Sequence, residues 1–218
     1  MLKNGKEGPL KAILVVDDHE IVRDGVTRII KADFGEYSPR AVSTYGEAME
    51  AVHEGNLALV IIDLSILGRG GIDLIQEITS INRDLPVLVY SMHDEKDFGL
   101  RAIKSGASGY VNKGKPTAEL KEAIKQLLNG KRYVSHDLAQ NLVSFVRKDT
   151  DRPPHERLST REFQILCRLT AGAQIKEIAS ELFLSVKTVS TYRARIFAKL
   201  DFKSIADMVK YAVDHGLV

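Results

Sequence analysis

The sequence predicts an α/β doubly wound domain with a parallel five-stranded sheet, followed by a small all-α domain of four helices. Short apolar runs alternate with amphipathic stretches up to about residue 130. The apolar runs lack period-two alternation, which is typical of parallel strands covered by helices on both faces. Strand patterns stop after Gly130, and only helical patterns follow from Leu158 onward. The chain therefore divides into an α/β part and a helical part.

Each strand of the first domain is expected at an apolar run, and the second run is the weakest. The runs are Ala12–Val16, a short one around Ala41 and Val42, Leu57–Ile62, Val87–Tyr90 and Gly109–Val111. Helices are expected at residues 20–32, 46–54, 71–82, 95–105 and 116–129. Thr44 with Glu47 forms a capping box, and Pro116 suits a first helical position. We expect this domain at residues 10–130, after a loose tail at 1–9.

The rest of the chain is expected to hold a linker and then helices only. Residues 131–155 contain one helical pattern, at 135–146, and lead into a polar stretch with two prolines, Arg147–Glu156. In the final domain, residues 156–218, Ser159 and Glu162 form a capping box. Helices are expected at residues 159–171, 174–182, 185–200 and 204–215.

Composition restricts the classes of protein to which the chain can belong. A length of 218 residues with 44% hydrophobic residues can fill two cores, which excludes disordered and fibrous proteins. No apolar run reaches the length of a signal peptide or the roughly 18 residues of a membrane span, so we expect a soluble, cytoplasmic protein with no membrane partner. One cysteine excludes an internal disulfide, and the six histidines show no metal-ligand spacing. Residues 156–218 carry 10 Lys+Arg against 7 Asp+Glu, which is compatible with a polyanionic partner.

Three aspartates stand where predicted strands end. Asp17 and Asp18 follow the first strand, and Asp63 follows the third. In a doubly wound sheet of order 2-1-3-4-5 these strands are neighbours, and ligands bind beyond the carboxyl ends of such strands. Two unit charges 4 Å apart repel by on the order of 4 kcal/mol at an effective dielectric of 20, so the cluster predicts a hard divalent cation. Mg²⁺ prefers such oxygen ligands and retains several waters.

Two further strand ends supply groups that phosphoryl chemistry requires. Ser91 closes the fourth strand with a hydroxyl, and Lys113 follows the fifth with an ammonium. Each can bind phosphoryl oxygens. We therefore expect Asp63 to attack the phosphorus of a donor, Lys113 and the metal to offset the developing charge, and Ser91 to follow the new group.

These positions resemble the CheY-like receiver family of two-component response regulators, over residues 10–130. That family has an Asp-Asp pair after strand one, a phosphoacceptor Asp after strand three, Ser or Thr after strand four and Lys after strand five. The resemblance implies that Asp63 is the phosphoacceptor and that a sensor histidine kinase supplies the phosphoryl group. It also implies that Asp18, Asp63 and the Ser65 carbonyl bind Mg²⁺ directly, with Asp17 acting through water.

The resemblance extends to one aromatic position and departs in one loop. Tyr110 stands where the family has an aromatic rotamer switch coupled to the Ser91 position, and simple packing is the alternative role for a tyrosine in a strand. Receivers commonly have Met-Pro three and four residues after the phosphoacceptor, whereas this chain has Ile66 and Leu67. Gly71 still matches. Without this proline, the loop that carries Ser65 is expected to be more mobile, which would affect metal affinity and the phosphorylation rate.

The stretch Ser185–Leu200 has the pattern of a DNA-recognition helix. It contains four basic residues and no acidic one. At 100° per residue, one face holds Val189, Tyr192, Ile196 and Leu200, and the opposite face holds Lys187, Thr191, Ala194, Arg195 and Ala198. Small residues on the second face permit close approach to a groove, with basic and hydroxyl side chains for phosphates and base edges. A solvated basic helix is the alternative.

Residues 156–218 resemble the LuxR/NarL-type (FixJ-like) helix-turn-helix. The segments at family spacing are Leu158–Glu162, Lys176–Ala179, Leu184–Ser185, Lys187–Val189 and Lys199–Leu200. By position, the resemblance implies base-facing roles for Ser190, Thr191 and Ala194. The other implied DNA contacts, mostly to the phosphate backbone, are Lys187, Thr188, Tyr192, Arg195 and Lys199. Tyr192 replaces a frequent His, and its hydroxyl can still donate to a phosphate.

Together the two halves predict a DNA-binding transcription regulator rather than an enzyme. Phosphorylation of Asp63 is expected to promote homodimerisation and binding to double-stranded promoter DNA. In one alternative, a DNA-binding regulator with a vestigial receiver, Asp63 accepts no phosphoryl group while DNA binding stays intact. In another, a Mg²⁺-dependent phosphatase, the chain turns over a phosphorylated small molecule, although its first strand lacks an Asp-x-Asp.

Overall fold

The computed structural model describes residues 10–66, 70–136, 138–140, 153–182 and 184–217. The chain divides into two compact units, Met1–Ala139 and Gln140–Val218, and this division falls within the expected linker. The expected tail, most of the linker and Leu67 lie outside the described residues. Within the described ranges, no helix has the length and apolar character needed to cross a membrane.

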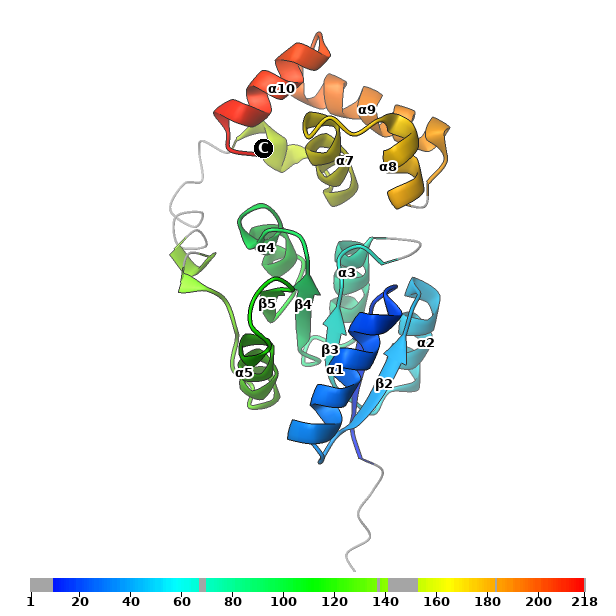
Figure 1. Ribbon diagram of the computed structural model, residues 1–218, viewed down its shortest axis with the longest axis vertical. Helices are drawn as coiled ribbons and strands as arrows, with labels where there is room; N and C mark the ends of the chain where they lie inside the picture. The colour runs from blue at the N-terminus through cyan, green and yellow to red at the C-terminus, as the bar shows by residue number, and fades with distance from the viewer. Residues whose placement is uncertain (1–9, 67–69, 137, 141–152, 183, 218) are drawn as a thin grey trace, which may run out of the picture. The chain divides into compact units, whose positions relative to one another are not determined.

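The first unit contains a parallel five-stranded sheet with the order β2-β1-β3-β4-β5 (Figure 1). The strands are β1 (Ala12–Val16), β2 (Ser38–Val42), β3 (Leu57–Ile62), β4 (Val87–Ser91) and β5 (Gly109–Asn112). The predicted fold class and strand order are confirmed. Because Val16 pairs with Ile62 at the ends of β1 and β3, the residues that follow these strands emerge side by side.

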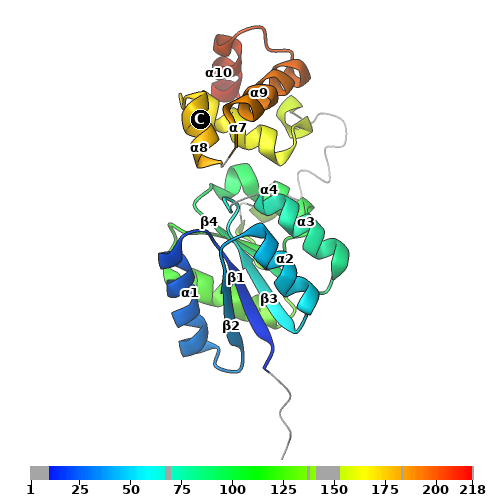
Figure 2. The same cartoon turned by 90° about the vertical axis from the view of Figure 1, so that its right-hand side faces the viewer.

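Helices α1 (Glu20–Asp33), α2 (Tyr45–Glu54), α3 (Gly71–Ile81), α4 (Glu95–Lys104) and α5 (Thr117–Leu128) connect the strands and continue the chain after them. Figure 2 shows α1 on one side of the sheet and α2 and α3 on the other. Ile13 and Ile61 belong to the core that α1 and α5 cover. Their neighbours Leu14 and Ile62 are equally buried. Burial on both faces explains why these strands are apolar at every position.

The predicted helix starts of this unit are confirmed at one position and wrong at another. Thr44 caps α2, since its hydroxyl accepts from Glu47 N (3.3 Å) and the Glu47 carboxylate accepts from Thr44 N (3.1 Å). Pro116 is the N-cap of α5 rather than its first helical residue. Its ψ of 144° is extended, so the helix begins at Thr117 even though the φ of −56° would suit a helix.

The edge at β2 explains why the strand pattern around Ala41 and Val42 is weak. The edge at β5 carries a backbone pairing that the sequence did not predict. Edge strand β2 has no fully buried residue and carries Pro39, which central strands exclude. The edge at β5 is extended by Tyr133, whose N donates to Ser108 O and whose O accepts from Tyr110 N, both at 3.1 Å. The residues directly after 130 therefore bind to the sheet. Of the helix expected at 135–146, residues 136 and 138–140 are helical, and 141–146 lie outside the described residues.

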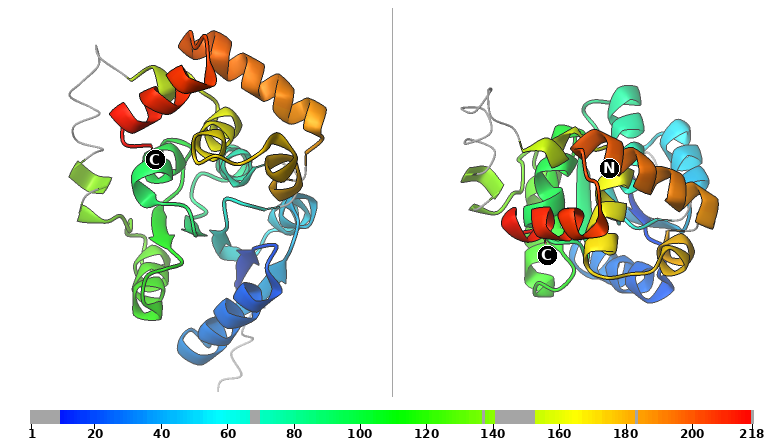
Figure 3. Two further views of the ribbon diagram at one scale, coloured as in Figure 1. Left: turned by 45° about the horizontal axis from the view of Figure 1, so that its top comes forward. Right: turned by 90° about the horizontal axis from the view of Figure 1, so that it is seen from above.

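The described residues of the second unit form helices and short connections. A 3-10 helix, Pro154–Arg157, precedes α7 (Thr160–Thr170), α8 (Ile175–Glu181), α9 (Val186–Leu200) and α10 (Ile205–Asp214). Figure 3 shows these helices in yellow to red. Their buried core includes Phe163, Leu166, Ile178, Val189, Ile196, Met208 and Ala212. Each of the four predicted helices is present.

Candidate acidic site and nucleic-acid interface

The carboxyl ends of β1, β3, β4 and β5 place four polar side chains together. Asp17 N donates to Val42 O (3.2 Å), Asp63 N to Val16 O (2.9 Å) and Lys113 N to Ser91 O (2.8 Å). These bonds continue the strand pairing by one residue, so the positions of all four side chains depend on the sheet itself. Asp17, Asp63 and Ser91 are buried, at no more than 3% exposure.

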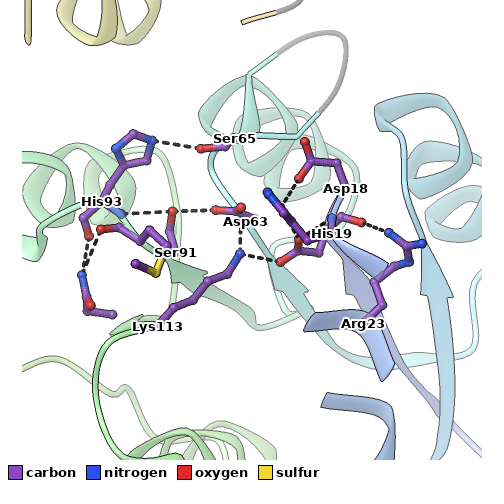
Figure 4. Close-up of polar contacts among 11 residues, drawn as sticks. Asp18, His19, Arg23, Asp63, Ser65, Ser91, His93 and Lys113 are labelled. Carbon is purple, nitrogen blue, oxygen red and sulfur yellow. Dashed lines mark hydrogen bonds and ion pairs between the residues drawn. The ribbon is translucent and has the colours of Figure 1, made fainter. Parts of the chain in front are cut away.

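Lys113 and Ser91 both contact the Asp63 carboxylate (Figure 4). Lys113 Nζ lies 2.9 Å from Asp63 Oδ2 and 2.6 Å from Asp17 Oδ2. Ser91 Oγ donates to the other oxygen, Asp63 Oδ1, at 2.5 Å. The structure thus brings together the residues that the sequence predicted for phosphoryl chemistry.

Burial and the charges of this cluster shift the pKa values of two of its members. Burial raises the pKa of Asp17, and Lys113 opposes this increase through a hydrogen bond and its charge. Burial alone would lower the pKa of Lys113, but the charge of Asp63 and the hydrogen bonds to both aspartates raise it above its usual value. Lys113 therefore remains an ammonium at neutral pH.

The residues beside Asp63 fit a divalent cation. Ligand atoms of Asp17, Asp18, His19 and Asp63 lie within 4.8 Å of one another. Asp18 Oδ1 is buried and accepts no hydrogen bond from any described residue, although His19 Nδ1 lies 2.7 Å away. A buried carboxylate oxygen beside two further carboxylates suits a Mg²⁺ ligand.

His19 was missed as a member of this cluster. The sequence predicts no metal site at the histidines, because their spacing along the chain matches none. Only the pairing of β1 with β3 brings the Asp63 carboxylate close to the His19 ring. Figure 4 also shows Arg23, which donates to Asp17 O at 2.7 Å. Adjacency of His19 to the Asp17-Asp18 pair was the available signal.

Ser65 and Tyr110 both contact His93, a residue that the sequence analysis also missed. Ser65 Oγ lies 3.0 Å from His93 Nε2. Tyr110 is 1% exposed, and its hydroxyl donates to His93 O at 2.9 Å. The Tyr110 ring therefore points into the protein, and its hydroxyl holds the loop between β4 and α4.

In the second unit, α9 presents the face that the sequence predicted. Val189 and Ile196 are buried. The side chains expected on the opposite face are all exposed: Lys187, Thr191, Ala194, Arg195 and Ala198. Ser185 caps α9, with Thr188 N donating to Ser185 Oγ at 3.0 Å. Leu184 N donates to Ala179 O at 2.8 Å, which fixes the described part of the connection from α8.

Several of the predicted DNA-contacting side chains of α9 make contacts within the unit. Ser190 Oγ donates to Val186 O and Thr191 Oγ1 to Lys187 O, both at 2.9 Å. The Arg195 guanidinium lies 5.8 Å from the centre of the Tyr192 ring. These contacts keep the polar side chains close to the helix, and Ala194 is exposed.

Lys199 joins α9 to α7 through a buried carboxylate. Its Nζ lies 2.7 Å from Glu162 Oε2, and the Glu162 side chain is only 3% exposed. Glu162 also accepts from Ser159 N (2.7 Å), so the predicted capping box is confirmed. Burial alone would raise the pKa of Glu162, but Lys199 and Ser159 lower it below its usual value.

We expect Glu162→Gln to lower the free energy of unfolding at pH 7 by about 1–2 kcal/mol, because a charged cap and its lysine partner are lost. Since the folded pKa of Glu162 is lowered, its contribution is present above the unfolded pKa of about 4.3 and is lost as pH falls through the folded pKa. The difference between wild type and variant should therefore shrink below about pH 4. Denaturant titrations at several pH values measure this difference in the free energy of unfolding.

Glu177→Gln is the matched control. Glu177 accepts from Gln174 N at 2.7 Å in the capping box of α8, but it is exposed. Glu177→Gln should therefore lower the free energy of unfolding by less than Glu162→Gln does. Equal losses for both variants, at every pH, would contradict a specific contribution from the Glu162–Lys199 pair.

Comparison with known proteins places both units in families. The response regulator receiver domain matches residues 13–125, and the luxR family of bacterial regulatory proteins matches residues 156–212. Response regulator UvrY of Escherichia coli is 32% identical over 206 residues, which cover 94% of each chain. Response regulator GacA of Pseudomonas aeruginosa is 36% identical over 209 residues, covering 94% of this chain and 97% of GacA.

A solved structure adds to this likeness. The two-component response regulator of the LuxR family from Aurantimonas sp. is 37% identical, with a TM-score of 0.56. The match covers 62% of this chain and 96% of that one. The chain therefore belongs to the two-component response regulators of the LuxR family, with a receiver domain followed by a LuxR-type DNA-binding domain.

Proposed function

We propose that this response regulator accepts a phosphoryl group on Asp63 from a sensor histidine kinase and thereby controls transcription from the promoters it binds. The observation that carries the proposal is the contact of one buried carboxylate with both Lys113 and Ser91. This arrangement offers a nucleophile with a cation and a hydroxyl donor already in place. The proposed site of action is the cytoplasm, where the DNA of a bacterial cell lies.

Each side chain of the site has a separate role in the proposed phosphoryl transfer. An oxygen of Asp63 attacks the phosphorus of the donor, and the bond from phosphorus to the donor breaks. Lys113 binds the phosphoryl oxygens, and Ser91 donates to the new group instead of to the carboxylate. Asp18, Asp63 and the Ser65 carbonyl would hold Mg²⁺, with Asp17 acting through water. When bound, this ion supplies positive charge beside the phosphoryl oxygens.

The proposed switch couples the phosphorylated site to DNA binding. Movement of Ser91 toward the phosphoryl group changes the β4–α4 loop, to which the Tyr110 hydroxyl is bonded. Tyr110 then acts as the rotamer switch, and the receiver favours a homodimer. Two copies of α9 can then bind two half-sites of double-stranded DNA. In this proposal, Ser190, Thr191 and Ala194 face bases, while Lys187, Thr188, Tyr192 and Arg195 contact the backbone. Lys199 is a further proposed DNA contact, and its Nζ also pairs with Glu162 Oε2.

Binding of the purified full chain to promoter DNA and to random DNA, with and without Mg²⁺ and a phosphoryl donor, tests this function. We expect tighter promoter binding and a larger hydrodynamic size only in the phosphorylated sample. Equal affinity and size in all samples would keep the DNA-binding domain but favour the alternative of a vestigial receiver.

We expect Arg195→Ala to weaken binding to promoter and random DNA by similar factors, because its exposed guanidinium faces the proposed DNA side of α9. The loss of one phosphate contact should reduce the slope of log affinity against log salt by about 0.9. Lys203→Ala removes an exposed cation outside α9 and should leave the slope unchanged. A slope unaltered by Arg195→Ala would exclude that residue from phosphate binding.

A further inference from the structure

A groove in the second unit lies beside α9, where the end of α7 meets the starts of α8 and α10. Its volume of about 540 Å³ falls within the roughly 300–1,000 Å³ of small-molecule sites. Met208, which is buried, belongs to its lining. Val186 and Ile205 also line it, although 48% and 58% of their surfaces are exposed. The groove therefore leaves large apolar side chains in contact with water.

The groove is positively charged. Its cations are Lys176 of α8 and Arg193 of α9, and no acidic residue lines it among the described residues. Arg193 is half-buried, yet within the described part of the chain neither cation forms an ion pair or a side-chain hydrogen bond. A cation that is partly removed from water is normally paired with an anion. The lining thus lacks the negative charge that would balance it.

The groove runs along α9 but away from its proposed DNA side. Val186 and Arg193 are seven residues apart, so they lie on one stripe about 10 Å apart along the helix axis. Each of them stands five residues before a residue of the exposed face, Thr191 and Ala198 respectively. A separation of five residues corresponds to about 140° around the helix. A ligand in the groove can therefore be elongated without covering the face proposed to bind DNA.

We propose that this groove binds an amphipathic organic anion, an acyl chain that ends in a carboxylate. The chain lies against Val186, Ile205 and Met208, where its burial removes apolar surface from water. The carboxylate accepts hydrogen bonds from Arg193 and Lys176. Inorganic phosphate would leave the apolar side chains exposed, and an uncharged chain would leave both cations unpaired. The inference does not depend on phosphorylation of Asp63.

The test is calorimetric titration of the full, unphosphorylated chain with decanoate, at concentrations below those at which decanoate forms micelles. We expect one decanoate to bind per chain. Octanoate and hexanoate should bind more weakly, by about twofold to fourfold for each methylene removed. Octan-1-ol has the chain without the charge, and acetate has the charge without the chain. Compared with octanoate, each should bind more weakly by about tenfold or more.

Variants of the lining locate the bound anion. Arg193→Gln and Lys176→Gln each remove one charge, and Ile205→Ser removes apolar surface. Each should weaken decanoate binding by about threefold to thirtyfold. Lys210→Gln and Val213→Ser are matched controls, because they change exposed side chains of α10 outside the groove and should leave binding unchanged. Lys176 and Ile205 are exposed, so their variants should stay folded even if Arg193→Gln does not.

Absence of decanoate binding would overturn the proposal, as would equal binding of octan-1-ol and octanoate or equal losses in groove and control variants. If decanoate does not bind and Ile205→Ser reduces the sedimentation coefficient of the unphosphorylated chain, the groove holds a second copy. If decanoate does not bind and Arg193→Gln and Lys176→Gln reduce the salt dependence of DNA affinity, the cations contact phosphates of DNA. Phosphoryl uptake by Asp63 enters none of these measurements, so the proposed function is tested separately.

Discussion

Asp63→Asn is expected to abolish phosphoryl incorporation, reducing label from a small acyl phosphate donor to the background of the assay. The amide is close in size to the carboxylate but is not a nucleophile at neutral pH. Ser91 can still donate to the amide oxygen, and Lys113 keeps its ion pair with Asp17 at 2.6 Å. The site should therefore stay folded. Promoter affinity should remain at the unphosphorylated level when the donor is added.

Asp73→Asn is a matched control, because it makes the same chemical change at an exposed carboxylate in the first turn of α3. It should incorporate label as the wild type does. Incorporation into Asp63→Asn at the wild-type level would identify another acceptor and refute the assignment of Asp63. A loss of label in both variants would instead point to damage to the fold.

Gly71→Ala is expected to lower the free energy of unfolding by about 2–3 kcal/mol, the cost of forcing an extra carbon into a packed position. A Cβ at Gly71 would lie 2.6 Å from Asp63 O and 2.7 Å from Leu64 Cα. Both are backbone atoms and cannot rotate away. Either α3 or the segment that carries Asp63 must shift, so phosphorylation should also slow. The denaturant midpoint and the rate of label uptake measure the two effects.

Gly25→Ala is the comparison for this change. Gly25 lies inside α1, and a Cβ there would meet no atom within 4 Å. Alanine is favoured over glycine in a helix interior by about 0.5–1 kcal/mol, so this variant should be slightly more stable than wild type. A loss of stability at Gly25 equal to that at Gly71 would mean that the clash with Asp63 is not the cause.

The sequence was most informative where the pattern within one short segment reports its structure directly. Central strands such as Leu57–Ile62 are apolar throughout because helices cover both faces. Capping boxes such as Ser159 with Glu162 are local pairs three residues apart. The sequence was less informative at the sheet edges, where Pro39 weakens β2 and where Tyr133 pairs by backbone atoms that leave no side-chain pattern.

By itself the sequence determined the order of strands and helices, the polar residues at the strand ends and the exposed face of α9. Only the tertiary structure decided which of these side chains make contact. Ser65 and His93 are 28 residues apart, and Glu162 and Lys199 are 37 apart. Such pairs depend on how separate elements pack and on the direction of each side chain. Periodicity reports which face of one element is buried, but it does not specify what that face meets.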